Sequence, residues 1–196
     1  MIKLSLSILY AFLIFWGMQF MRPESSPSKG IVRLDTLKNA NAWPENDITV
    51  SNFAGSDIAP SPACIAVAAT GEVFVGIDKI GSLGKTPGLG YILKLEDANQ
   101  DGKVDKSTEF AKVDNPRGIL SVGDKVYVLH TVFSKETGKA SGMDLVVFED
   151  ADHDGKADGP SKPLIQHISS PKFLQNRGTD HSTNGIRMGI DGWIYI

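Results

Sequence analysis

The sequence has a single cysteine, Cys64, in 196 residues, which excludes an internal disulfide. It also lacks the Cys-x-x-Cys-His pattern through which haem is attached covalently. No cysteine closely follows the apolar run near the N-terminus, so a lipoprotein anchor is not expected. Positive charge is not in excess either. The net charge is −3, which argues against nucleic acid as a partner.

Long helical patterns are also missing. After residue 47, no stretch has both the length and the 3.6-residue periodicity of an amphipathic helix. Glycine and proline are plentiful instead, with 20 and 10 residues, and both favour turns. The sequence therefore predicts an all-β, turn-rich protein.

The N-terminal residues 1–21 have the composition of an export signal. Lys3 precedes a mostly apolar run, which the polar segment "RPESSPSKG" follows. The residues before that segment are bulky rather than small, so an uncleaved membrane anchor is the alternative to a cleaved signal peptide. In both cases we expect an exported protein: periplasmic, anchored facing the periplasm, or secreted. Residues 22–47 are interpreted as a linker.

From residue 48 onward, short alternating runs are separated by turn residues, and their order repeats after about 53 residues. Phe74 in the first unit corresponds to Tyr127 in the second, and "NGIRMGIDGWIYI" (184–196) opens a third. Four short strands repeated at this spacing are typical of a β-propeller blade. We expect residues 48–196 to be about two blades and the start of a third from a six-bladed ring. Such a segment cannot close a ring, so the chain is expected to be the N-terminal part of a longer protein.

Two acidic loops recur at the same place in the repeat, in "LEDANQDGKVD" (95–105) and "FEDADHDGKAD" (148–158). An EF-hand is excluded, because strands precede the loops and loop position 12 is Thr108 or Ser161 instead of Glu. Oxygens at alternate positions can still converge on Ca²⁺. A plain Asx-type turn without a cation is the alternative. The candidate ligands are Asp97, Asn99, Asp101 and Asp105 in the first loop, and Asp150, Asp152, Asp154 and Asp158 in the second.

The richest polar stretch is "NRGTDHSTNGIRMGIDGWIYI" (176–196), in which His181 lies eight residues before Gly189 of a Gly-Ile-Asp turn. This stretch resembles the soluble pyrroloquinoline-quinone (PQQ) sugar dehydrogenases and the related sorbosone-dehydrogenase-like propellers. The repeated DGK turns also resemble the membrane-bound dehydrogenase-like family of large exported bacterial proteins. The resemblance covers about residues 48–196. Trp193 and Tyr195 alternate with isoleucines and are expected to pack between blades.

The resemblance implies an exported dehydrogenase that oxidises a sugar or polyol hydroxyl with PQQ and passes electrons to an acceptor such as a c-type cytochrome. His181 would be the general base, and Arg187 and Asn184 would contact the cofactor. The alternative for His181 is a hydrogen-bonding role in the loop, and Arg187 could simply pair with an acid. Two other functions stay open: a non-catalytic propeller that binds glycan or protein, and a calcium-dependent lactonase-like hydrolase that would use Asn184 and Asp180.

Overall fold

The computed structural model describes residues 50–81 and 87–196. The predicted export segment (1–21) and linker (22–47) lie outside the described residues. Within the described part of the chain, no helix has the length and apolar character needed to cross a membrane.

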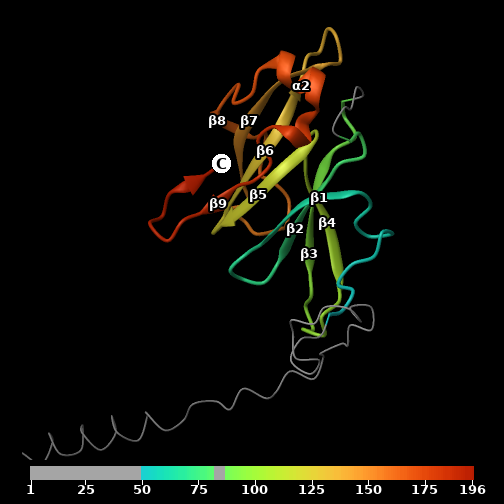
Figure 1. Cartoon of the computed structure of the whole chain (residues 1–196). Helices are drawn as coiled ribbons and strands as arrows, with labels where there is room; N and C mark the ends of the chain where they lie inside the picture. The colour runs from blue at the N-terminus through green and yellow to red at the C-terminus, as the bar shows by residue number, and fades with distance from the viewer. Residues whose placement is uncertain (1–49, 82–86) are drawn as a thin grey trace, which may run out of the picture. The chain divides into compact units, whose positions relative to one another are not determined.

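Two four-stranded antiparallel sheets make up most of the described structure (Figure 1). In each sheet, strands that follow one another in sequence are hydrogen-bonded neighbours. The first sheet consists of β1 (Pro62–Val67), β2 (Val73–Ile77), β3 (Tyr91–Glu96) and β4 (Lys106–Lys112). The second consists of β5 (Pro116–Val122), β6 (Lys125–Phe133), β7 (Ala140–Glu149) and β8 (Lys162–Ile165). The all-β prediction and the two four-stranded units are confirmed.

The strand register repeats as well as the strand order. In the first sheet Phe74 pairs with Lys94. In the second, Tyr127 pairs with Val147, and both of these residues lie 53 positions further along the chain. The turn between the first two strands differs in length. In the second sheet, two residues separate the paired Val122 and Lys125. In the first sheet, three residues separate Ala68 from Glu72, and the Ala68 N–H donates to the Glu72 carbonyl. The extra residue lies in the turn, so the ladder beyond it is unaffected.

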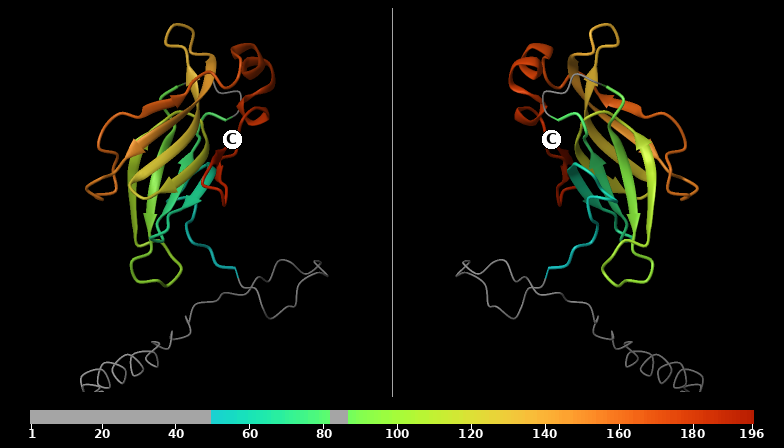
Figure 2. Two further views of the ribbon diagram at one scale, coloured as in Figure 1. Left: turned by 90° about the vertical axis from the view of Figure 1, so that its left-hand side faces the viewer. Right: turned by 90° about the vertical axis from the view of Figure 1, so that its right-hand side faces the viewer.

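The two sheets lie against each other (Figure 2). Aromatic side chains belong to the buried cluster between them. Phe74 and Phe110 of the first sheet meet edge to face, with ring centroids 5.2 Å apart. Phe110 meets Phe148 of the second sheet in the same way at 6.1 Å. Gly76 lets the sheets approach, because a Cβ there would lie 2.9 Å from the Pro116 ring, which opens β5. Edge-to-face pairs of this kind add stability beyond the area they bury.

Both sheets carry apolar side chains on both faces. On β2, Phe74 faces the second sheet, whereas Val75 and Ile77 join a cluster on the opposite face with Phe53 and Ala59. The second sheet behaves similarly, because Leu129 and Met143 pack with Leu174 away from the first sheet. Strands β2 and β7 therefore read as almost continuous apolar runs, a pattern typical of sheets covered on both sides.

A short helix, α2 (Pro171–Arg177), follows the second sheet and buries Leu174. Ser170 caps it by accepting a hydrogen bond from the Phe173 N–H, and Pro171 occupies its first turn. The sequence pattern did not predict this helix, because two turns are too short to show a 3.6-residue periodicity.

The third unit begins with a small hairpin of β9 (Arg187–Met188) and β10 (Ile194–Tyr195). Ile186 is buried against β5, where a Cβ on Gly118 would lie 3.0 Å from the isoleucine side chain. Trp193 and Tyr195 are 72% and 57% exposed, so neither described sheet buries them, and their packing between blades stays a prediction.

Replacing Phe110 with Ala is expected to lower the free energy of unfolding by about 3–5 kcal/mol, because it empties the contact that joins the sheets. Chemical denaturation monitored by circular dichroism measures this loss. Phe173→Ala is the matched control, because that ring is 43% exposed on α2 and its removal should cost less than about 1 kcal/mol. Equal losses in the two variants would contradict the assigned core.

Candidate functional site

The connections between strands divide the predicted site residues between the two ends of the sheets. In each up-and-down sheet, the turns after the first and third strands lie at one end, and those after the second and fourth at the other. The acidic loops follow β3 and β7, whereas His181, Asn184 and Arg187 follow β8. The predicted metal ligands and the predicted catalytic residues are therefore not brought together (Figure 1).

The first acidic loop satisfies its own carboxylates. Asp97 accepts hydrogen bonds from the backbone N–H groups of Asp101 (3.1 Å) and Gly102 (2.8 Å). One oxygen of Asp105 accepts from the Ala98 N–H at 2.8 Å. The other accepts from the side-chain amide of Asn99 at 3.1 Å. Gly102 has a φ of 84°, which L side chains rarely adopt, so glycine is needed at the turn.

The second acidic loop has the same course but is less well satisfied. Asp158 Oδ2 accepts from the Ala151 N–H at 2.8 Å, as Asp105 does from Ala98. Asp150, Asp152 and Asp158 each offer a carboxylate oxygen, and these three atoms lie within 4.8 Å of one another. Asp150 is only 5% exposed, and its Oδ1 has no hydrogen-bond partner. This loop thus gathers three carboxylates, one of which has a buried oxygen without a hydrogen-bond partner.

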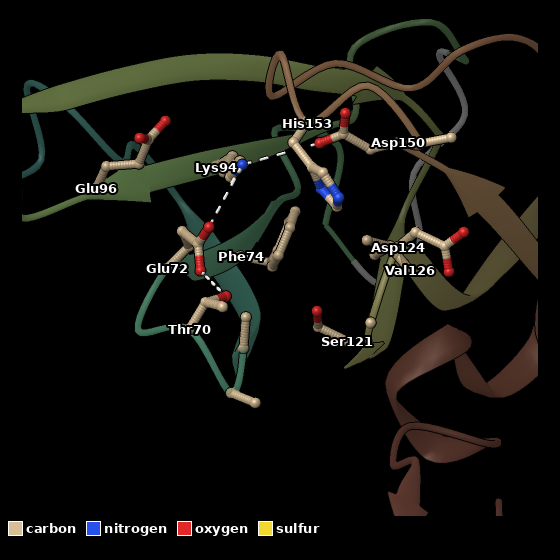
Figure 3. Close-up of a pocket in the computed structure, with 14 residues that line it drawn as sticks. Thr70, Glu72, Phe74, Lys94, Glu96, Ser121, Asp124, Val126, Asp150 and His153 are labelled. Atoms are coloured by element: carbon tan, nitrogen blue, oxygen red, sulfur yellow. Dashed lines mark hydrogen bonds and ion pairs between the residues drawn. The ribbon is translucent and has the colours of Figure 1, made fainter.

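A cleft of about 590 Å³ opens between the sheets beside this loop (Figure 3). Lys94 of β3 extends into it, with Nζ 3.6 Å from Glu72 Oε1 and 3.8 Å from Asp150 Oδ2. The ammonium therefore reaches from the first sheet to the second acidic loop. Burial raises the pKa of Asp150, and the nearby Lys94 lowers it without fully compensating.

Backbone hydrogen bonds hold each acidic loop to the unit that precedes it. The Ala157 N–H donates to the Phe110 carbonyl of β4 at 2.9 Å. One repeat earlier, the Val104 N–H donates to the Phe53 carbonyl at 3.2 Å. The first loop thus binds the segment before β1, and the second loop binds β4 in the same way.

The predicted catalytic residues share one solvent-exposed segment. His181 ends the short 3₁₀ turn η2 (Thr179–His181), and its side chain is 68% exposed with Nε2 3.9 Å from Asp180 Oδ2. The Asn184 amide donates to the Asp180 carbonyl. Arg187 lies on β9, and its Nη1 donates to the Ile186 carbonyl at 3.0 Å. Among the described residues, no hydrogen bond or ion pair joins His181 to Asn184 or Arg187.

Sequence analysis missed a buried polar network beneath this segment. Arg117 Nη2 forms an ion pair with Asp78 Oδ2 at 2.8 Å, and Arg117 Nε also donates to Thr179 Oγ1 at 3.1 Å. Asn115, which is fully buried, donates to Asp78 Oδ2 at 2.9 Å and accepts from Thr131 Oγ1 at 2.6 Å. The network joins the end of β2, the start of β5 and the turn that carries His181. The available sequence signal was Asp78, an acidic residue directly after an apolar strand. That pattern did not indicate Arg117 as its partner.

Cys64 is not a candidate nucleophile. Burial is the main cause that raises the pKa of its thiol to about 12, so the thiolate is scarce at neutral pH.

At pH 8, Cys64 is expected to react with a disulfide reagent roughly a thousandfold more slowly in the folded protein than in the urea-unfolded protein. The reason is the rise in the thiol pKa from 9.0 to about 12 on folding. Absorbance at 412 nm with Ellman's reagent gives both rates. Similar rates in the two states would show that the thiol is not held in a desolvated position.

Arg117→Met is expected to lower the free energy of unfolding by about 3–5 kcal/mol, because it leaves the Asp78 carboxylate buried without its charge partner. Denaturant titration measures the change. Lys125→Met is the control, because the Lys125–Asp124 pair is 41% and 44% exposed and should contribute less than about 1 kcal/mol. A loss as small as that of the control would mean that the pair is hydrated and unimportant for stability.

No curated protein and no solved structure matches this chain. A family model matches residues 42–196, which include both sheets and the polar segment after them. On that match, the chain belongs to the family described as a domain of unknown function (DUF7133).

Proposed function

We propose that the two sheets are the first blades of an exported β-propeller that oxidises a sugar or polyol hydroxyl. The observation that carries the proposal is the solvent-exposed polar segment around His181, which follows a repeated four-stranded unit and is anchored from beneath by Arg117. The resemblance of this segment to the PQQ sugar dehydrogenases supplies the type of reaction.

The packing supports the propeller. Blades stack face to face around an axis, so each needs apolar residues on both faces, and both sheets have them. Ile65 and Val67 of β1 are more than half exposed, as are Trp193 and Tyr195 of the third unit. Further strands of a six-bladed ring would cover these side chains.

In the proposed reaction, His181 takes the proton from the substrate hydroxyl. Imidazole is a common general base, and the Asp180 carboxylate lies beside this one, with Oδ2 3.9 Å from Nε2. The 3₁₀ turn sets the position of the ring, and Arg117 holds the start of that turn through Thr179.

The donor types on this segment fit PQQ, which carries carboxylates and quinone oxygens. The Arg187 guanidinium and the Asn184 amide would hold the cofactor, and bound PQQ would accept the hydride. Electrons would then pass to an acceptor such as a c-type cytochrome. The second candidate function is a non-catalytic propeller that binds glycan or protein. The high exposure of His181 favours it, because general bases are usually more enclosed.

His181→Gln is expected to lower kcat by about 10²–10⁴-fold without a change in melting temperature, because the exposed ring contributes to proton transfer and not to the core. The assay uses the natural full-length protein loaded with PQQ and Ca²⁺, and follows dye reduction over a panel of sugars and polyols. His167→Gln, an exposed histidine outside the segment, serves as the control and should retain full activity.

No turnover by the wild-type protein on any substrate, together with glycan binding that does not need PQQ, would replace the dehydrogenase with the binding function. Hydrolysis of lactones under the same conditions would instead support a lactonase.

A further inference from the structure

We propose that the second acidic loop (150–158) binds one divalent cation of the Ca²⁺ type through Asp150, Asp152 and Asp158, and that the first loop (97–105) does not. The first loop would need no cation, because the Asn99 amide supplies the donor that its carboxylates require. This inference does not depend on the proposed dehydrogenase activity.

The buried oxygen of Asp150 is the observation that points to a ligand. Asp150 is 95% buried, and Lys94 Nζ lies 3.8 Å from its Oδ2. Oδ1 has no hydrogen-bond partner. Leaving a buried acceptor unsatisfied destabilises the folded state, most of all for a charged group, so native proteins rarely do so without a ligand. The group that Asp150 forms with Asp152 and Asp158 would place a cation against this carboxylate.

The chain contains its own comparison, because the two loops differ at the decisive position. Asn99 in the first loop is replaced by Asp152 in the second. The Asn99 amide donates to Asp105 Oδ1 at 3.1 Å. Asp152 cannot donate to the equivalent Asp158, and it adds a negative charge instead. The substitution thus removes an internal donor and creates a demand for positive charge at the same point.

The ligand chemistry favours Ca²⁺ over Mg²⁺ and over transition metals. All three candidate side chains offer carboxylate oxygens, which suit hard cations. Asp152 and Asp158 are exposed, so water can complete the six to eight ligands that Ca²⁺ accepts in irregular geometry. Mg²⁺ demands a near-ideal octahedron and gives up its water reluctantly. Lys94 extends from the opposite sheet, and its Nζ lies 3.8 Å from Asp150 Oδ2.

A cation there would also strengthen the contact between the sheets. The same loop donates the Ala157 N–H to Phe110 of β4, and its Asp150 faces Lys94 of β3. Fixing the loop therefore fixes two points at which the second sheet touches the first.

Reciprocal exchange of the two residues tests the proposal. The natural full-length protein is stripped with chelator, and the Ca²⁺ bound per chain is measured by equilibrium dialysis, with no sugar or quinone present. Asp152→Asn should bind one equivalent less than the wild-type protein, and Asn99→Asp should bind one more. Because only differences are compared, cation sites elsewhere in the protein do not interfere.

Thermal unfolding provides a second readout. Ca²⁺ should raise the melting temperature of the wild-type protein more than that of Asp152→Asn, and Mg²⁺ at equal concentration should raise it less. Asp158→Asn, whose side chain can still accept from the Ala151 N–H, provides an independent variant should Asp152→Asn fold poorly. Equal Ca²⁺ binding by the wild-type protein and both loop variants would overturn the site. Unchanged Ca²⁺ binding in Asn99→Asp would overturn the assignment of the amide as the substitute for a cation.

Discussion

The contact between the two sheets is the interaction on which the rest of the structure depends. Phe110 is at its centre, because its ring meets Phe74 on one side and Phe148 on the other. Its backbone carbonyl also receives the hydrogen bond from the second acidic loop. A four-stranded sheet with apolar side chains on both faces needs a cover on each face, so each unit depends on what lies beside it. A repeated sequence is expected for units that cover one another's apolar faces.

The sheets separate two kinds of chemistry. At one end, carboxylates cluster beside an inter-sheet cleft that contains a buried lysine. At the other, a histidine, an amide and a guanidinium lie on an open segment whose base is fixed by a buried ion pair. The antiparallel topology enforces the separation, since consecutive turns alternate between the ends. A binding event at the acidic loops therefore acts on the stability of the scaffold and does not touch the exposed polar segment directly.

Most of the fold could be predicted from local patterns. Alternation located the eight main strands, and similarity at a spacing of about 53 residues indicated that they form two equivalent units. Local patterns failed where structure depends on partners distant in the sequence. Asp78 and Arg117 lie 39 positions apart, and neither sequence context indicates the other.

Trp193 and Tyr195 alternate as packed strand residues do, but burial depends on whether a neighbouring sheet covers them. The difference between the acidic loops was visible as Asn99 against Asp152, yet its meaning required the hydrogen bond from the Asn99 amide.

The main-chain bonds from Val104 to Phe53 and from Ala157 to Phe110 use no side-chain atoms. Attachment of each loop to its neighbour is thus insensitive to which side chains the loop carries. Mutation can change the loop's charge or its affinity for ions while the architecture stays the same. A repeated fold of this kind can diversify the chemistry of one unit at a time, because the loops are held by backbone groups that every residue except proline provides.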